Sequence, residues 1–345
     1  MSLLLKSIRN LSELTIDIDK DWQEYPILNI GVPPADKDVL ARGLPDIYSC
    51  DYGLNWADLG AIAAVTIHGM AYLGNGIAVF GADRHVWRST DYGATWADLG
   101  VIATDGVQTM VYLGNGIAIF GEINGHIFRS TDHGLNWADL GAISANHIRS
   151  MAYLGNGIAI FGEDNSHIFR STDYGLNWAD LGVIATALTH GMAYLGNGIA
   201  IFGDDNGHVF RSTDYGLNWV DLGVQGTGGL WCMAYLGNGI AIFADDNGHV
   251  FRSTDYGATW ADLGAISAIL IDSMAYLGNG ITILGNGIGH VFRSIDYGAT
   301  WVDLGVISPG HDFYDMAYLD NGIAIAGDDV GHVFRSTSAF QLWRR

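Results

Sequence analysis

The sequence predicts an all-β protein, a seven-bladed β-propeller of four-stranded antiparallel blades, and three observations support this prediction. The motif Ser-x-Asp-x-Gly-x-x-Trp occurs seven times, first at an interval of 40 residues and then at intervals of 41. A second motif, Met-(Ala or Val)-Tyr-Leu followed by Asn-Gly-Ile, also occurs seven times, and each unit holds four short apolar runs. A unit of this length cannot bury its own apolar face, so it must stack on copies of itself. The seven motif aspartates are Asp51, Asp91, Asp132, Asp173, Asp214, Asp255 and Asp296.

The unit that begins at Asp173 shows the elements of one blade in order. Gly196-Asn197-Gly198 is a turn sequence that favours positive φ, and it separates the second expected strand from the third. A second turn, residues 204–207, leads to the last strand of the unit. Four antiparallel strands in a repeat of this length are typical of a propeller blade. The four expected strands cover residues 178–182, 191–195, 199–202 and 208–213.

The two ends of the chain offer alternative ways to close the ring. The inner strand pair occurs seven times, but the outer hairpin can be counted eight times, from residues 47–49 before Trp56 to residues 332–337 before Trp343. Either the N-terminal hairpin completes the last blade or the C-terminal one does. Closure by strands from both ends removes an exposed sheet edge in each case.

Residues 1–44 lie outside the repeats, and we assign them to an N-terminal arm on a propeller domain of residues 45–345. The arm holds all the lysines and three of the five prolines. Leu14, Ile16 and Ile18 alternate with polar residues, which predicts a strand with one buried face. A segment this short cannot build a core, so it must pack against something larger.

Residues 12–43 resemble a segment of tailed-phage tail fibre and receptor-binding proteins. The matching runs are Leu14-Thr15-Ile16-Asp17, Asp21-Trp22 and residues 25–33, whereas residues 38–44 depart from the Ala-Thr-Lys-x-Tyr-Val-Asp ending of that family. The resemblance implies a virion (tail) protein or prophage product, with an extracellular protein as the alternative. It also implies that the arm attaches to a virion or tail protein, and it implies either a homo-trimer or attachment to a symmetric tail, which leaves the oligomeric state open.

The Ser-x-Asp-x-Gly-x-x-Trp motif resembles the Asp-box, or BNR repeat, of sialidases and several unrelated propellers. In that family the box lies in the turn between the third and fourth strands, on the face away from the usual active site. Its physical role is structural, because Asp accepts hydrogen bonds from turn amides, Gly supplies the backbone conformation and Trp packs between blades. We therefore do not count these residues as site residues.

Two further residues recur in every unit, a His at the start of the third strand of the blade, which is the last expected strand of the unit, and an Arg three residues later. A residue that every copy carries is better explained as a packing or hydrogen-bonding partner than as a metal or proton site. The acidic turns, such as residues 204–207, are explained by hairpin chemistry. We expect no metal and no cofactor. The two sets are His85, His126, His167, His208, His249, His290 and His332, and Arg88, Arg129, Arg170, Arg211, Arg252, Arg293 and Arg335.

The copies differ mainly in the connection between the Trp strand and the Met strand. These connections emerge on the face opposite the Asp-box turn and lead to the innermost strand, at the mouth of the central channel. Loops on a rigid scaffold are common recognition sites, and aromatic rings beside polar groups suit sugars or a protein surface. We predict no catalytic residue and the following ligand-binding residues: His147, Arg149, His190, Trp231, Asp272, His311, Asp312, Phe313 and Tyr314.

Charge and composition limit the partners. The net charge of −21 argues against binding nucleic acid or an anionic membrane.

The first six residues are too short an apolar run for a secretory signal, and no stretch reaches the roughly 18 apolar residues of a membrane span, so we expect no membrane insertion. Cys50 and Cys232 occupy non-equivalent places in distant repeats, which predicts no disulfide framework and leaves their redox state open.

Three functions fit these features. We favour a non-enzymatic virion attachment or receptor-binding protein whose variable face recognises a host surface glycan or protein. A glycoside hydrolase is the first alternative, although a sialidase-like site implies clustered arginines, and only Glu122 and Glu163 lie within the repeats. The pair Asp272 and Asp312 keeps this alternative open. A purely structural virion scaffold is the second.

Overall fold

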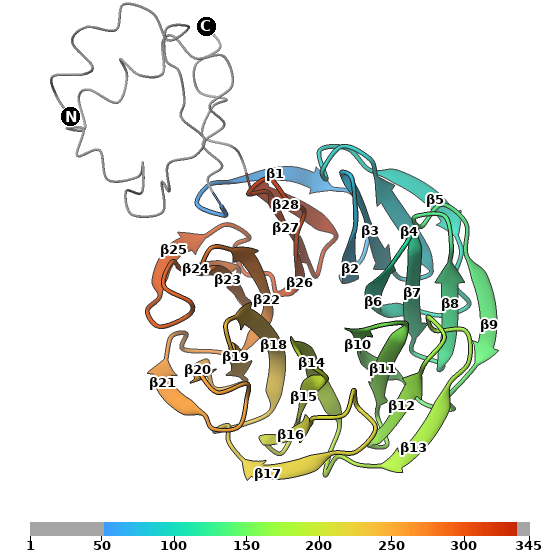
Figure 1. Cartoon of the computed structure of the whole chain (residues 1–345). Coiled ribbons are helices and arrows are strands. Elements are labelled where there is room, and N and C mark those ends of the chain that lie inside the picture. Colours follow the sequence, from blue (N-terminus) through green and yellow to red (C-terminus); the bar gives the residue numbers. More distant parts are fainter. Residues whose placement is uncertain (1–51, 337–345) are drawn as a thin grey trace, which may run out of the picture. The chain divides into compact units, whose positions relative to one another are not determined.

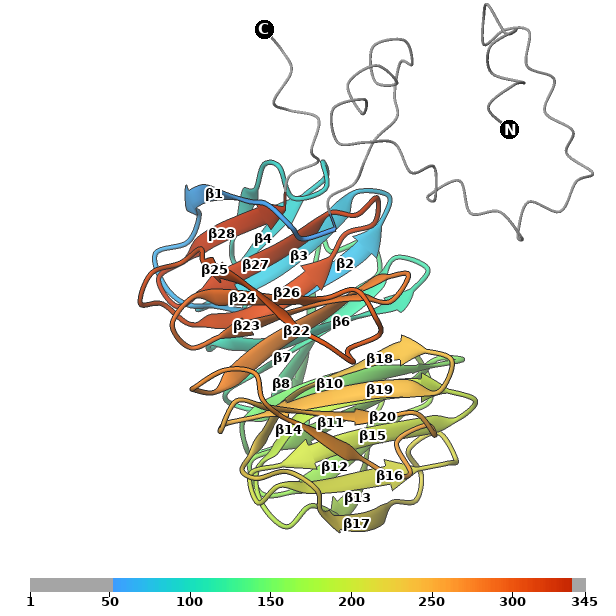
Figure 2. The ribbon, with the colours of Figure 1, turned by 90° about the vertical axis from the view of Figure 1, so that its left-hand side faces the viewer.

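The computed structural model describes residues 52–336, and the proposed arm of residues 1–44 lies outside them. The described residues form seven four-stranded antiparallel sheets around a central channel (Figure 1). In the side view the sheets of neighbouring blades lie face to face (Figure 2). Within the described part of the chain, no helix has the length and apolarity needed to cross a bilayer. The predicted seven-bladed, all-β propeller is confirmed.

Each blade runs from an innermost strand at the channel to an outermost strand at the rim. The innermost strands are β2 (Ile67–Gly74), β6 (Val107–Gly114), β10 (Ile148–Gly155), β14 (Thr189–Gly196), β18 (Leu230–Gly237), β22 (Ile271–Gly278) and β26 (Phe313–Tyr318). The second strands are β3 (Ile77–Ala82), β7 (Ile117–Glu122), β11 (Ile158–Glu163), β15 (Ile199–Asp204), β19 (Ile240–Asp245), β23 (Ile281–Asn286) and β27 (Ala324–Asp328). The third strands are β4 (His85–Ser89), β8 (His126–Ser130), β12 (His167–Ser171), β16 (His208–Ser212), β20 (His249–Ser253), β24 (His290–Ser294) and β28 (His332–Ser336). The outermost strands are β5 (Ala97–Val101), β9 (Ala138–Ala142), β13 (Ala179–Val183), β17 (Val220–Val224), β21 (Ala261–Ala265), β25 (Val302–Val306) and β1 (Trp56–Ala61). We number the blades 1 to 7 in the order of their innermost strands.

The N-terminal strand closes the ring, which decides between the two alternatives. β1 pairs antiparallel with β28, so the last blade has the order β1-β28-β27-β26 (Figure 1). The register places Trp56 opposite Ser336 and Ala61 opposite His332. Blade 7 is thus built from both ends of the described chain, and no outer edge of β28 is left without a partner. Trp343, which the other closure would use, lies outside the described residues.

The hydrophobic core lies between neighbouring blades. Phe161 is fully buried, stacks on Phe169 of its own blade at a ring-centroid distance of 4.5 Å, and meets the edge of Trp178 at 4.9 Å. The same cluster contains Leu113 and Ile119 from the preceding blade. Since each cluster takes side chains from two blades, no blade can bury its apolar face alone.

The Ser-x-Asp-x-Gly-x-x-Trp turn joins the third strand of a blade to the outermost one. The Asp173 carboxylate accepts hydrogen bonds from the backbone of Asn177, at 2.9 Å, and of Leu176, at 3.1 Å. Gly175 has a φ of +74°, and a Cβ there would lie 3.1 Å from Ile119 of the preceding blade. The indole of Trp178 donates to the Gly175 carbonyl. The motif therefore fixes the turn and its contact with the preceding blade, as a structural role requires.

The repeated histidines and arginines are also used in building the ring. The Nδ1 atom of His167 lies 3.0 Å from both carboxylate oxygens of Asp180 on the outermost strand. The Nε of Arg170 donates to the carbonyl of Tyr215, in the turn of the next blade, at 2.8 Å. Equivalent bonds recur in the other blades. They agree with the expected packing and hydrogen-bonding role.

Thr282 on β23 offers a test of this repeat packing. It is fully buried, and its hydroxyl has no hydrogen-bond partner among the described residues. The six equivalent positions carry alanine: Ala78, Ala118, Ala159, Ala200, Ala241 and Ala324. An unpaired buried hydroxyl costs roughly 1–3 kcal/mol. We expect Thr282→Ala to raise the free energy of unfolding by about 1 kcal/mol in chemical denaturation. Ala241→Thr is the matched control and should lower it; a less stable Thr282→Ala protein would contradict the prediction.

Candidate functional site

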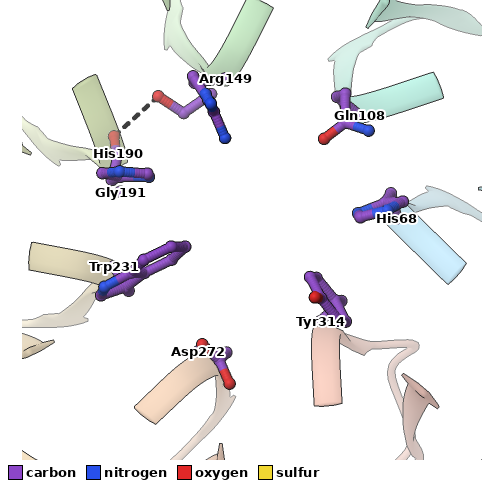
Figure 3. A pocket seen from close by; sticks show the side chains of 9 residues that line it. His68, Gln108, Arg149, His190, Gly191, Trp231, Asp272 and Tyr314 are labelled. Atoms are coloured by element: carbon purple, nitrogen blue, oxygen red, sulfur yellow. Dashed lines mark hydrogen bonds between the residues drawn. The ribbon is translucent and has the colours of Figure 1, made fainter. Parts of the chain in front are cut away.

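The innermost strands place one side chain from every blade at the channel mouth. It is the residue two positions before the methionine of the inner strand motif, and these seven residues are called the channel ring (Figure 3). The residue before each ring position is fully buried between blades, like Ile148 before Arg149. The channel ring consists of His68, Gln108, Arg149, His190, Trp231, Asp272 and Tyr314.

A β-bulge places most of these side chains. In blade 3, Ile148 is paired with Glu163 and Ser150 with Gly162, so Arg149 has no residue opposite it. The same jump in register occurs at Gln108, Trp231, Asp272 and Tyr314. Bulges commonly re-aim a side chain beside a functional site. Here they turn the ring residues towards the channel while their neighbours stay in the core.

The channel ring encloses a cavity of about 390 Å³, to which Ser150 and Gly191 also contribute. The Ser150 hydroxyl donates to the carbonyl of His190 at 2.8 Å, which ties blade 3 to blade 4 at the wall of the cavity (Figure 3). The cavity has the size of a small-molecule site and combines aromatic rings with a few polar groups, as such sites usually do.

One half of the cavity combines aromatic rings with a carboxyl group. Asp272 projects from blade 6 between Trp231 of blade 5 and Tyr314 of blade 7 (Figure 3). Its buried Oδ2 atom has no hydrogen-bond partner among the described residues. Burial and, secondly, the charge of Asp312 raise the pKa of Asp272 to about 8. Burial and the charges of Asp312 and Asp272 also raise the pKa of Tyr314. This half therefore holds an acidic group for which the described structure shows neither an ion pair nor a hydrogen bond to its Oδ2 atom.

The other half carries basic groups that already have partners. The Nε atom of Arg149 donates to Asp164 at 2.5 Å. His190 Nε2 lies 2.6 Å from Asp205 Oδ1, at ion-pair distance although without hydrogen-bond angles, and His190 lowers the pKa of Asp205. The His190 ring also lies 4.4 Å from that of Trp231. The positive charge of this half is therefore largely compensated.

His68 completes the ring next to Tyr314. The two rings meet edge to face, with centroids 4.8 Å apart. Burial and, secondly, the charge of His147 lower the pKa of His68 to about 4, so its imidazole is neutral at pH 7. His68 therefore presents a neutral aromatic edge rather than a charge.

The structure brings five of the predicted binding residues together in the cavity: Arg149, His190, Trp231, Asp272 and Tyr314. The other four lie apart from its lining. His147 is largely buried, with its pKa lowered to about 4 by burial and then by Arg149, and His311 pairs with Asp329 at 2.8 Å. Asp312 raises the pKa of Asp272 but does not line the cavity.

Phe313 is placed in the core instead of at the site. It is fully buried and meets the Phe334 ring at 5.5 Å, because it precedes the bulge that turns Tyr314 into the channel. Two residues of the channel ring, His68 and Gln108, are absent from the sequence prediction, as are the lining residues Ser150 and Gly191. The signal that could have found His68 and Gln108 is the register, since both stand two residues before the motif methionine, like the five that were predicted.

Comparison with known proteins finds solved structures that share the fold of this chain. No protein-family model and no curated protein matches the chain. Among solved structures, YCF48 bound to D1 peptide is similar at 18% identity, with a TM-score of 0.69 over 82% of this chain and 96% of that one. A catalytically inactive virginiamycin B lyase from Staphylococcus aureus with quinupristin has a TM-score of 0.72 at 11% identity, over 81% and 98%. The WD40 propeller domain of Doa1 has a TM-score of 0.68 at 12% identity, over 84% and 98%.

At these identities the likenesses show the fold alone. Fold and site together define the class of protein, a seven-bladed β-propeller with a polar and aromatic cavity at the mouth of its channel. Propellers host many unrelated functions, so the function must be argued from the cavity.

Proposed function

We propose that this chain is a non-catalytic recognition protein that binds its ligand in the cavity of the channel ring. One observation carries the proposal. The repeats are nearly identical, yet the seven equivalent ring positions hold six kinds of side chain, and all of them line the same cavity. The methionine two residues later is the same in every copy. A scaffold with no ligand has no need of such chemical variety in one place.

The cost of the cavity's polar groups supports the same conclusion. Trp231 Nε1 and Asp272 Oδ2 are both buried without a hydrogen-bond partner in the described structure. Unpaired buried polar groups destabilise a fold by roughly 1–3 kcal/mol each. Such groups are retained at binding sites, where a ligand or bound water can satisfy them. Thr282, discussed above, is a further unpaired group, but it lies in the core of a blade.

We further propose that the ligand is a host surface glycan or protein and that the chain is a homo-trimeric virion tail protein. The resemblance of residues 12–43 to tail-fibre proteins supports this, with the arm attached to the virion. Trp231 and Tyr314 beside Asp272 and Gln108 offer the stacking surfaces and hydrogen-bonding groups that sugar rings need. YCF48 with D1 peptide and virginiamycin B lyase with quinupristin are examples of similar propellers solved with a bound molecule.

A glycoside hydrolase remains the second candidate because Asp272, with its pKa raised to about 8, has the property of a general acid. Hydrolysis by the usual mechanisms needs a second carboxylate across the scissile bond. Asp272 is the only carboxylate among the residues lining the cavity in the described chain. This favours binding over catalysis.

A glycan array, followed by a turnover assay on each glycan that binds, tests the proposal. We expect binding without release of product. Turnover of a bound glycan would contradict the proposal and would show that the protein is a glycoside hydrolase. If no glycan on the array binds, glycans are excluded as ligands, and the ligand is a protein receptor or the protein has a structural role.

A further inference from the structure

We infer that the half of the cavity formed by Trp231, Asp272 and Tyr314 binds an ammonium group, and that the ligand is a glycan that carries one. The inference rests on the proposed function, since it names the ligand chemistry of the same site. The inference states that the ligand carries a positive charge. Neither the fold nor the repeat pattern specifies the charge of the ligand.

The geometry of this half suits an organic cation. Trp231, Asp272 and Tyr314 come from three consecutive blades, and both aromatic rings project into the channel on either side of the carboxyl group (Figure 3). Aromatic rings attract cations to their faces, and the attraction grows where water is excluded. A carboxylate between two such rings adds direct charge pairing. A neutral sugar would use the rings for stacking but would gain nothing from the ionised form of Asp272, whereas a cation pairs with it.

The protein itself supplies no cation for this half. Residues 52–336 contain no lysine, and the arginines of the repeat donate to backbone carbonyls of neighbouring blades, as Arg170 does to Tyr215. Arg149 is paired with Asp164, and Arg84 lies 3.8 Å from Asp83. Within the described chain, each arginine thus already has a partner.

The rim of the cavity carries five aspartates, four of which lie within 4.0 Å of a basic side chain: Asp83 of Arg84, Asp164 of Arg149, Asp205 of His190 and Asp329 of His311. The turns between the second and third strands lie on the face around the cavity, because the connections to the next blade bond to them, as Ile102 does to the carbonyl of Arg84. The acidic residues of these turns are Asp83, Asp164, Asp205, Asp246 and Asp329.

The protonation of Asp272 makes the inference testable by pH. With a pKa of about 8, Asp272 is mostly protonated at pH 7 in the empty site, and a cation must displace the proton. Affinity for a ligand of fixed positive charge should therefore rise with pH, by up to about tenfold per unit between pH 6 and 8. A neutral ligand that accepts a hydrogen bond from protonated Asp272 would show the opposite trend.

The groups that face Asp272 do not obscure this trend. Its charged or titratable neighbours are Asp312, Tyr314 and Cys232, and burial raises the pKa of each of the three. The Cys232 thiol and the Tyr314 hydroxyl thus stay protonated through the range. The charge of Asp312 acts in the same direction as burial, since both raise the pKa of Asp272.

The first experiment compares choline with 3,3-dimethylbutan-1-ol, its uncharged isostere, by calorimetric titration of the full chain at pH 6, 7 and 8. We expect choline to bind at least about tenfold more tightly at pH 8 and its affinity to rise with pH. Asp272→Asn should lose this preference and the pH dependence. Asp246→Asn, an acidic residue of the same face outside the cavity lining, is the matched control and should keep both.

Three results would overturn the inference: equal binding of the two probes, an affinity for choline that falls as pH rises, or unchanged choline binding by Asp272→Asn. The probe comparison needs no variant, so it stands even if a variant is unstable. Glucosamine should also bind more tightly than glucose. If Nα-acetyl-lysinamide binds more tightly than glucosamine, the ammonium group belongs to a protein ligand and the inference of a glycan is wrong. If the array finds only neutral glycans, the inference of a positively charged ligand is wrong, while the proposed function stands.

Discussion

Deletion of residues 1–61 is expected to abolish cooperative folding, whereas deletion of residues 1–44 should leave the propeller intact. The longer deletion removes β1, the partner of β28, and with it the turn before β1. Gly53 in that turn lies against Leu277 and Ile283 of blade 6, and Trp56 belongs to the core cluster between blades 6 and 7. The carbonyl of Tyr52 accepts a hydrogen bond from Arg293 at 2.9 Å. The deletion therefore opens the ring and exposes the core between two blades.

Thermal unfolding followed by near-ultraviolet circular dichroism checks this prediction. The shorter deletion is the matched control, because it removes the arm without touching β1. We expect a sharp transition for the control and none for the longer deletion. An unchanged melting temperature after removal of residues 1–61 would mean that another strand closes blade 7.

Trp231→Ala should lose about 30-fold or more in affinity for the glycans found by the array, with little change in melting temperature. Aromatic residues at the centre of a binding site commonly contribute about 2 kcal/mol or more. Trp231 presents its ring to the cavity and contacts His190, so its removal deletes a wall of the site (Figure 3). The space it leaves opens to the channel rather than forming a closed void in the core.

Two further variants make this result specific. Trp231→Phe keeps an aromatic face and should retain more affinity than Trp231→Ala. Leu176→Ala changes a half-exposed residue of the turn on the opposite face and should bind like the unmodified protein. Unchanged binding by Trp231→Ala, or an equal loss for Leu176→Ala, would show that the ligand does not enter the channel ring.

Much of the architecture is readable from the sequence because it is repeated. A residue that recurs at every interval of the chain, such as His167 or Arg170 and their equivalents, must serve what every blade needs, and the structure uses both in bonds that hold strands and blades together. The same reasoning places the variable connections at the channel mouth. This comparison of the copies predicts five of the seven residues of the channel ring. His68 and Gln108 escape it because the choice of candidates rested on side-chain type and not on the shared register, two residues before the motif methionine.

The sequence by itself determined the propeller, its seven blades, the structural role of the repeated motifs and the face on which the copies differ. Only the tertiary structure decided which end closes the ring, since that depends on whether β1 or a C-terminal segment reaches the edge of β28. It also decided that Tyr314 faces the channel while Phe313 is buried, because a bulge changes the alternation of the strand. The aromatic and acidic half of the cavity exists only once blades 5, 6 and 7 stand side by side in the closed ring, which brings together residues about 40 positions apart in the chain.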